Sequence, residues 1–174
     1  MPVADRSGLI DDSWTKLADD ESAAKGAPII VSLERLKSEH NSLFADASEV
    51  GVEVSGGVNL DDLKPFLSQL GIVVVRFDAM KDGRRFSVGR LLRERYGFEK
   101  DLRASGPFIP DQALFLLRCG FTSFDVGEDV SIETLKRSIS AYSAWYQRAS
   151  DRVATVLDLR HDGAGGPANG NSTL

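Results

Sequence analysis

The chain has 174 residues, and its 21 basic and 26 acidic side chains give a formal net charge of -5. This negative balance argues against wholesale binding to nucleic acid or to an anionic membrane. A single cysteine excludes an internal disulfide and a cysteine metal cage, and the 42% hydrophobic content is ordinary for one globular domain. The sequence has no secretion signal and no apolar run long enough to cross a bilayer, so we expect a cytoplasmic protein that spans no membrane.

The sequence divides into an arm, a domain and a tail. Residues 1–27 carry a short apolar pattern around Ile10, Trp14 and Leu17, which predicts a small N-terminal arm or hairpin packed on the domain by its tryptophan. Residues 28–160 form the expected α/β domain. Residues 161–174 are rich in Gly and Asn with almost nothing to bury, so we expect a disordered tail.

Within residues 28–160, short β-branched runs alternate with stretches of helical period. This alternation predicts right-handed βαβ crossovers and a mainly parallel sheet covered by helices. A flavodoxin-like strand order and a partial β/α barrel both fit, because periodicity does not order strands. The expected strands are Ile29–Ser32, Val52–Val54, Ile72–Phe77, Leu102–Ala104 and Phe121–Val126. The expected helices lie near Leu33–Ala45, Leu60–Leu70, Phe86–Tyr96 and Asp111–Cys119.

The last predicted helix is the best marked. Ser131 can cap it, and apolar residues from Ile132 to Val156 recur at three- and four-residue steps. We therefore expect one long C-terminal helix that packs on the sheet. The same stripe would also serve as the seam of a homodimer.

The stretch "KDGRRFSVGRLLRERYGF" places five arginines and one lysine in this acidic chain, just after the predicted central strand. Asp82 and Gly83 form a tight turn, and Arg84 and Arg85 follow at the mouth of the next helix. A planar guanidinium matches sulfate, phosphate or carboxylate through bidentate hydrogen bonds. Arg90 and Arg93 lie on the polar face of the same helix. The alternative is a solvated helix face whose arginines pair with acids such as Glu94 and Asp101.

Ligands of parallel sheets usually bind beyond the carboxyl ends of the strands. Ser105 and Gly106 end one predicted strand, where the glycine would let a ligand or another backbone approach closely. Asp125 ends the next strand. Arg103 lies inside a predicted strand, and burial would be costly unless it pairs with an acid, for which Asp78 and Asp125 are the candidates.

These residues also form a recognisable combination. "DGRRFSVGRLLRERYGF", followed by "LRASGPFIPDQ" and "RCGF", resembles the uncharacterised bacterial family known as domain of unknown function 934. Its members carry DGR, a serine three residues on, an LRER block, LRA-x-G, a DQ pair and RCGF. The resemblance covers roughly residues 28–147 and is strongest from Asp82 to Phe124. It carries over the following residues: Asp82, Gly83, Arg84, Ser87, Leu92, Arg93, Arg95, Arg103, Gly106, Asp111, Gln112, Cys119 and Gly120.

The resemblance implies a context and no reaction. Members of the family are often encoded beside assimilatory sulfite reductase and are called probable oxidoreductases. Redox chemistry needs a flavin, a nicotinamide, a metal or a dithiol, and the sequence offers no credible dinucleotide loop, ligand cluster or second cysteine. We therefore expect no cofactor and no metal, and an accessory role with sulfite reductase or its electron donor as partner.

Three hypotheses follow. In the first, the protein binds a small oxyanion or an acidic partner surface through an arginine-rich site at the strand ends. In the second, it is an enzyme acting on a phosphorylated or sulfated small molecule, with Asp82 or Asp125 as base and the arginines as a clamp. In the third, it is a purely structural homodimer. Nucleic-acid binding ranks below all three. The predicted ligand site comprises Asp82, Gly83, Arg84, Arg85, Ser87, Arg90, Arg93, Arg103, Ser105, Gly106 and Asp125.

Overall fold

The sheet at the centre of the protein is built from the predicted β-branched runs. A computed structural model describes residues 2–22, 25–55, 57–79, 83–127 and 130–163. The five expected strands are confirmed within a few residues of their predicted bounds, and they pair in parallel. They are β4 (Pro28–Ser32), β5 (Glu49–Val54), β6 (Ile72–Arg76), β7 (Asp101–Ser105) and β8 (Ser123–Asp125).

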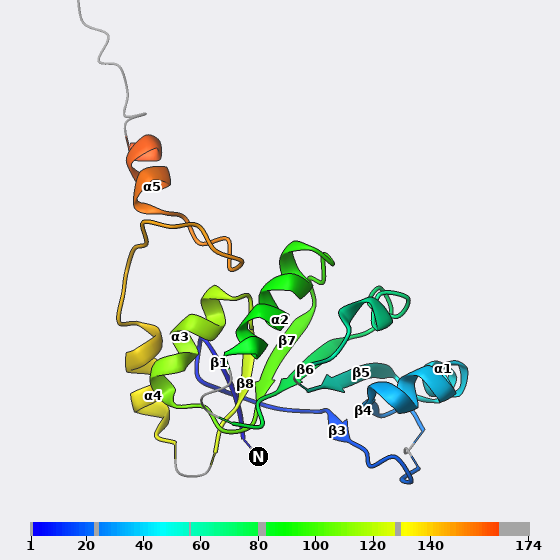
Figure 1. Ribbon diagram of the computed structural model, residues 1–174. Coiled ribbons are helices and arrows are strands. Elements are labelled where there is room, and N and C mark those ends of the chain that lie inside the picture. Colours follow the sequence, from blue (N-terminus) through cyan, green and yellow to red (C-terminus); the bar gives the residue numbers. More distant parts are fainter. Residues whose placement is uncertain (1, 23–24, 56, 80–82, 128–129, 164–174) are drawn as a thin grey trace, which may run out of the picture.

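The N-terminal arm extends this sheet at both edges. β1 (Val3–Asp5) pairs antiparallel with β2 (Leu9–Ile10) and with β8, whereas β3 (Thr15–Lys16) pairs parallel with β4. The resulting eight-stranded order is β2-β1-β8-β7-β6-β5-β4-β3. β4 to β8 follow chain order without reversal, and the sheet curls as a half-barrel (Figure 1). The chain is thus a single α/β domain with a mostly parallel sheet, and the flavodoxin-like order is not confirmed.

Helices cover one face of the sheet (Figure 1). The first, third and fourth expected helices are confirmed as α1 (Leu33–Asp46), α2 (Arg84–Glu94) and α3 (Pro110–Arg118). The expected helix over Leu60–Leu70 is wrong, because only a 3-10 turn, η1 (Leu60–Asp62), forms before a series of turns. Pro65 explains this, since proline lacks the amide hydrogen and its ring clashes with the preceding helical turn.

The long C-terminal helix is also wrong. Ser131 does cap α4 (Ile132–Ile139), but the helix ends there, and a second short helix, α5 (Val156–Gly163), begins after an irregular stretch. The Ser140 hydroxyl donates to the carbonyl oxygens of Lys136 and Arg137, a local bond that competes with continued helix. The expected disordered tail begins inside α5, and its residues 164–174 lie outside the described part of the chain.

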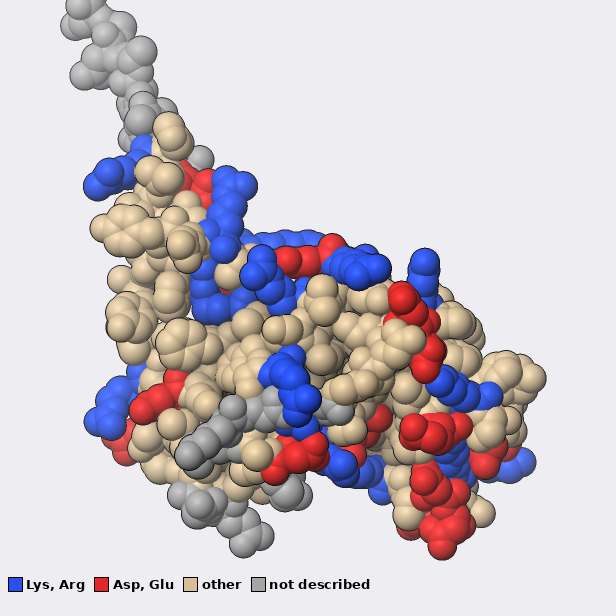
Figure 2. All heavy atoms as spheres, viewed as in Figure 1, with Lys and Arg blue, Asp and Glu red and all other residues tan. Residues whose placement is uncertain are grey.

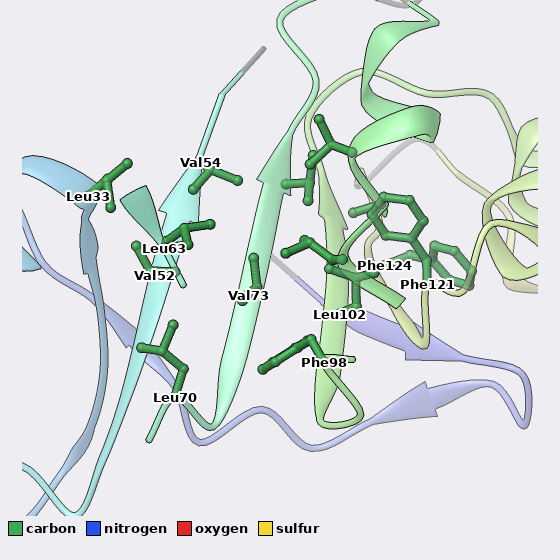
Figure 3. Close-up of a cluster of buried hydrophobic side chains, with 14 of the residues drawn as sticks. Leu33, Val52, Val54, Leu63, Leu70, Val73, Phe98, Leu102, Phe121 and Phe124 are labelled. Carbon is green, nitrogen blue, oxygen red and sulfur yellow. The ribbon is translucent and has the colours of Figure 1, made fainter. Parts of the chain in front are cut away.

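Alternation along the strands separates two apolar layers. Val52, Val73 and Leu102 point toward the helices and join the main core, part of which is drawn in Figure 3. Ile72 and Val74 belong to a smaller cluster on the opposite face, together with Ile30. Trp14 packs against that cluster as the arm crosses the face, so the predicted anchoring by this tryptophan is confirmed.

Charge is unevenly distributed over the surface. Figure 2 shows Asp and Glu side chains gathered toward the end that carries β3 and α1. Lys and Arg side chains gather where α2 ends and the C-terminal segment, residues 140–163, returns to the domain. Within the described residues, no helix has both the length and the apolar character needed to cross a membrane.

Candidate functional site

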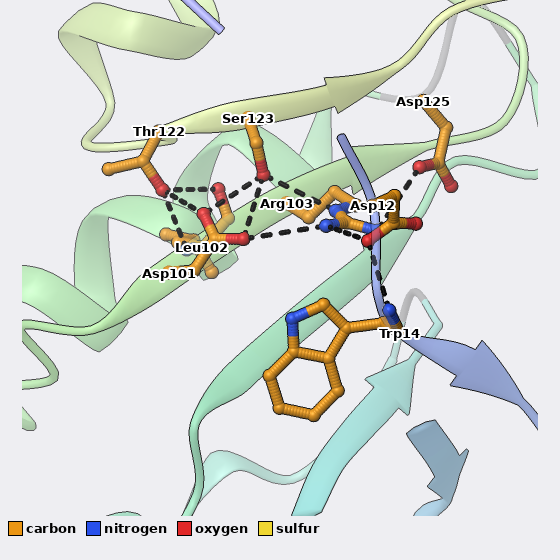
Figure 4. Close-up of polar contacts among 8 residues, drawn as sticks. All are labelled: Asp12, Trp14, Asp101, Leu102, Arg103, Thr122, Ser123 and Asp125. Atoms are coloured by element: carbon orange, nitrogen blue, oxygen red, sulfur yellow. Dashed lines mark hydrogen bonds and ion pairs between the residues drawn. The ribbon is translucent and has the colours of Figure 1, made fainter. Parts of the chain in front are cut away.

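Arg103 is the centre of a polar cluster on the face of the sheet that the arm crosses. Its guanidinium makes a two-pronged ion pair with Asp12 of the arm, with nitrogen to oxygen distances of 2.9 and 3.0 Å. Asp101 and Asp125 each lie 3.7 Å away, and the Ser123 hydroxyl accepts from Nε at 3.3 Å (Figure 4). Arg103 is only 4% exposed. The predicted pairing of Arg103 is therefore confirmed for Asp125 and wrong for Asp78, which pairs with Arg76 and Arg85 instead. Asp12, which was not predicted, is the closest partner of Arg103.

The pKa of the Asp125 carboxyl is raised above its ordinary value. Burial raises the pKa of its carboxyl, against the opposing effects of a hydrogen bond from Ser105 and the positive charge of Arg103. The structure thus brings together three predicted site residues, Arg103, Ser105 and Asp125. Because three carboxylates surround one guanidinium, the cluster carries an excess of negative charge and does not favour a further anion.

The sequence predicted that Gly106 would let either a ligand or another backbone approach closely, and the structure shows the approach of another backbone. Its φ is +99°, and a Cβ at this position would lie 2.2 Å from the carbonyl oxygen of Phe77. The amide of Phe77 in turn donates to the Ser105 carbonyl oxygen at 2.6 Å. Glycine here joins the ends of β6 and β7, so its presence needs no ligand to explain it.

The start of α2 holds the next group of predicted residues. Gly83 directly precedes the helix, and Arg84 and Ser87 are exposed on it. Arg85 is buried, forms an ion pair with Asp78 and lies over the Phe77 ring at 5.7 Å. The remaining predicted residue of this group, Asp82, lies outside the described residues.

The far end of α2 holds Arg90 and Arg93, so the predicted arginines do not converge on one rim. Arg93 is eight residues from Arg85, which corresponds to about 12 Å along a helix. Arg90 is exposed and pairs with Glu94 one turn on, with both oxygens 3.0 Å from its Nε. Arg85 lies at the carboxyl ends of the strands, whereas Arg93 lies at their amino-terminal ends, beside the starts of β7 and β8.

Arg93 is held by backbone rather than by acids. Nε donates to the carbonyl oxygen of Gly120 at 2.8 Å, and Nη1 donates to those of Phe98 at 2.5 Å and Lys100 at 2.8 Å. A Cβ on Gly120 would lie 2.4 Å from Cγ of Arg93, so the glycine makes room for the side chain. Among the described residues no carboxylate forms an ion pair with Arg93. Burial lowers the pKa of this guanidinium; Asp101 opposes the shift and the nearby charge of Arg152 reinforces it.

A cavity of about 750 Å³ lies in front of Arg93. We call it the Arg93 cavity. Arg6, which follows β1, and Arg152 of the C-terminal segment also line it, so three guanidinium side chains border one space. Phe98, Leu117 and Phe121 form its apolar wall. This is the region where Figure 2 shows Lys and Arg side chains gathering.

Carboxylates also border the Arg93 cavity, but each is already engaged. Asp5 accepts from the amides of Ser7 and Gly8, and Asp151 accepts from Arg118 at 2.7 Å. Glu94 accepts from Arg90 and from Ser150, and these hydrogen bonds lower its pKa. Glu99 pairs with Arg152 at 3.1 Å in an exposed contact, which contributes little.

Against these engaged acids, two cations have weak or no acidic partners. The only ion pair of Arg6 among the described residues is a 3.8 Å contact to Oδ2 of Asp151, whose Oδ1 accepts a hydrogen bond from Arg118. All the hydrogen bonds of Arg93 among the described residues go to carbonyl oxygens, and its guanidinium lies over the Phe98 ring at 5.6 Å from the centroid. The Arg93 cavity therefore places guanidinium groups with few carboxylate partners beside an apolar wall, an arrangement that suits an anion attached to an organic body.

Sequence reasoning found Arg93 but missed Arg6 and Arg152. Arg6 reaches the cavity because β1 adds antiparallel to β8, and Arg152 reaches it because the C-terminal segment folds back instead of continuing as helix. Neither event leaves a periodic signal in the sequence.

The structure gives no sign of a reactive thiol at the single cysteine, Cys119, because burial raises the pKa of this thiol. In the part of the chain that the structure describes, no group of three or more His, Cys, Asp or Glu side chains is placed so that it could hold a metal ion.

Comparison with models of protein families identifies the family of this chain. The model of a family described as bacterial protein of unknown function (DUF934) matches residues 51–157. These residues include most of β5, all of β6 to β8, α2, α3 and α4, and most residues that line the Arg93 cavity. No curated protein matches the chain.

Proposed function

This chain belongs to the bacterial family of unknown function DUF934, and we propose that it is an accessory protein of assimilatory sulfite reduction that binds a small anion in the Arg93 cavity. The link to sulfite reduction comes from the family resemblance described above. The binding of an anion is inferred from the arrangement of the residues around Arg93. In this proposal the protein acts in the cytoplasm beside sulfite reductase or its electron donor and performs no chemistry of its own.

The observation that carries the proposal is the way Arg93 is held. Three carbonyl oxygens fix the guanidinium without neutralising its charge. Fixing a cation in advance lowers the entropy lost when an anion binds, and a partly buried site strengthens the interaction. The predicted anion site thus moves from the carboxyl ends of the strands to their amino-terminal ends, and Arg6 and Arg152 replace Arg84 and Arg85 as the companions of Arg93.

The walls narrow the class of ligand. A volume of about 750 Å³ exceeds what a bare sulfite or sulfate needs and lies within the range of small-molecule sites. Phe98, Leu117 and Phe121 offer contacts that an inorganic ion leaves unused. An adenylylated sulfate, which joins an oxyanion to an aromatic ring, uses both halves of the cavity and is therefore the favoured ligand.

Calorimetric titration of the full chain with sulfite, sulfate and an adenylylated sulfate tests this proposal. We expect saturable binding that weakens with added salt and raises the melting temperature, strongest for the adenylylated ion. Arg152→Glu should weaken affinity at least about 10-fold. Arg84→Glu makes the same charge change at the opposite end of α2 and should leave affinity within about 2-fold. No binding of any oxyanion, or a larger loss from Arg84→Glu, would refute the proposal.

One observation favours a second candidate, the enzyme hypothesis. Asp125 has a raised pKa and lies at the carboxyl end of β8, where catalytic groups of such sheets are found. The candidate base is, however, already engaged by Ser105 and Arg103. Turnover of phosphorylated or sulfated small molecules that is lost in Asp125→Asn would favour this reading over an accessory role.

A further inference from the structure

A second cavity lies beside the Arg93 cavity, between the turns that follow η1 and the connection from α2 to β7. Its volume is about 500 Å³, and we call it the Lys100 cavity. Phe98 and Glu99 line both cavities, so the two spaces lie on either side of this short stretch of chain. The Arg93 cavity and the Lys100 cavity therefore share a wall.

The chain after α2 builds one side of the Lys100 cavity. The Phe98 amide donates to the Leu92 carbonyl oxygen at 2.9 Å, and the Phe98 side chain is buried in the main core. The Tyr96 hydroxyl donates to the carboxylate of Asp61 at 2.7 Å, which joins the end of α2 to η1. The two segments that border the cavity are thus held together by a hydrogen bond across it.

Three cations line the Lys100 cavity. Lys64 follows η1, whereas Arg95 and Lys100 lie in the connection from α2 to β7. Among the described residues, none of these three side chains forms a hydrogen bond or an ion pair, and Arg95 alone has another contact, over the Tyr96 ring at 5.7 Å. A cation at the end of a helix interacts favourably with the helix dipole, which explains Arg95 but not the two lysines on other segments.

Two carboxylates also line the Lys100 cavity, and both already have partners. Asp61 accepts from Tyr96, and Glu99 pairs with Arg152 of the neighbouring cavity at 3.1 Å. Three cations against two carboxylates leave a formal excess of one positive charge, in a chain whose total is -5. Since that excess consists of cations without an ion-pair partner in the described part of the chain, it is available to an added anion.

We infer that the Lys100 cavity binds a second anionic group of the ligand whose first anionic group binds Arg93. The ligand is then a small organic molecule with two separated anionic groups, such as a nucleotide with phosphates on two ribose hydroxyls. Once the first group is held, the second binds at a high effective concentration, so unpaired cations in an adjoining cavity raise the affinity for such a molecule. The inference rests on the anion site proposed above and extends it to a second cavity.

Calorimetric titration of the full chain tests the inference with two probes, adenosine monophosphate and an adenosine bisphosphate that carries one further phosphate on the ribose. We expect the bisphosphate to bind at least about 10-fold more tightly. Lys64→Gln combined with Lys100→Gln should reduce this preference to about 2-fold or less, with affinity for the monophosphate unchanged within about 2-fold. These substitutions leave the backbone in place, so the Lys100 carbonyl oxygen still accepts from Arg93.

Lys25→Gln combined with Lys136→Gln is the matched control, because it removes the same charge from exposed positions that line neither cavity. The preference for the bisphosphate should change by less than about 2-fold in this control. The inference fails if the bisphosphate binds no more tightly than the monophosphate, if the preference survives in the Lys64 and Lys100 variant, or if the control also removes it.

Two further titrations separate the sources of a failure. Inorganic phosphate added to the monophosphate complex should bind far more weakly than the bisphosphate gains, and tight binding of the free ion would overturn the assignment of both groups to one ligand. The adenylylated sulfate, titrated into the same variants, reports on the Arg93 cavity alone. Its binding without a preference for the bisphosphate would refute only the second cavity, whereas no binding of any nucleotide would refute the proposed function as well.

Discussion

Arg103 and Arg93 are both drawn into the body of the protein, but different chemistry surrounds their charges. Arg103 faces three carboxylates, Asp12, Asp101 and Asp125, and joins the N-terminal arm to β7 and β8. Arg93 faces three backbone carbonyls and a cavity that Arg6 and Arg152 also line. The first site neutralises its cation within the chain, and the second fixes a cation and leaves its charge available.

The comparison teaches how to separate a structural arginine from a binding one. Burial and position in the sheet do not distinguish them, because Arg103 is the more buried and lies nearer the strand ends where ligands usually bind. What distinguishes the two arginines is the number and the charge of the groups that accept their hydrogen bonds. Carbonyl dipoles satisfy hydrogen bonds without cancelling the net charge, so an external anion has something left to interact with.

Arg103→Met should give the largest effect. It leaves Asp12, Asp101 and Asp125 close together without a cation, and we expect a loss of about 3–5 kcal/mol in the free energy of unfolding. Urea denaturation at neutral pH measures it. Asp12→Asn is the matched control and should cost only about 1 kcal/mol, because two carboxylates remain beside Arg103. A loss below about 1 kcal/mol for Arg103→Met would mean that the cluster does not join the arm to the sheet.

Arg93→Lys should reduce the free energy of unfolding less than Arg103→Met does, but it should strongly reduce the affinity for the anion. The lysine keeps the charge but cannot reproduce the planar set of bonds to Gly120, Phe98 and Lys100, so we expect a loss of about 2 kcal/mol. Anion affinity measured by calorimetry should fall at least about 10-fold, since the cation is no longer fixed. Unchanged affinity in a folded variant would show that the anion, if bound, lies elsewhere.

Asp125→Asn tests the acidic cluster through pH. The fold raises the pKa of Asp125 above its ordinary 3.8, so the folded chain binds this proton more tightly than the unfolded chain does. Proton binding therefore stabilises the folded chain at low pH, and this stabilisation is lost as the pH rises through the raised pKa. The variant does not ionise and should be more stable than the parent at pH 7, by less than about 1 kcal/mol. The difference should vanish as pH falls below the ordinary value. A variant that is less stable at pH 7 would reverse the sign and contradict the assignment.

Glu99→Gln should change the free energy of unfolding least, and it should raise the affinity for the anion slightly. The Arg152–Glu99 pair is exposed on both sides, at 80% and 72%, so its loss should change stability by less than about 0.5 kcal/mol. Freed from this partner, Arg152 should raise anion affinity by about 2-fold to 3-fold at low salt. A fall in affinity would indicate that Glu99 belongs to the binding site rather than competing with the ligand.

Strands and most helices of this fold were predictable because their signals are local. The sequence of β6 begins with a continuous apolar run. α1 and α3 have helical periodicity, with Ser32 capping the start of α1 and Pro110 at the first position of α3. The pairing of Arg103 with Asp125 was predictable too, since adjacent parallel strands bring their ends together. Both wrong helices had a competing local feature, Pro65 in one and the serine-rich stretch after Ile139 in the other.

The Arg93 cavity was not predictable from the same signals. It needs β1 to pair with β8 and the C-terminal segment to fold back onto α3, two contacts between residues far apart in the sequence. Helical periodicity could place Arg93 on the polar face of α2 but could not say which end of the sheet it would face. Three-dimensional pairing, rather than composition, decides which arginines share a ligand.

The location of a bound anion tests the central claim most directly. Selenate is a sulfate analogue whose selenium is visible by anomalous diffraction, and crystals grown with it would show where the ion binds. We predict a peak within hydrogen-bond distance of Arg93 and Arg152 that disappears in Arg152→Glu crystals. A peak only at the carboxyl ends of the strands, beside Arg84 and Arg85, or none at all, would contradict the account.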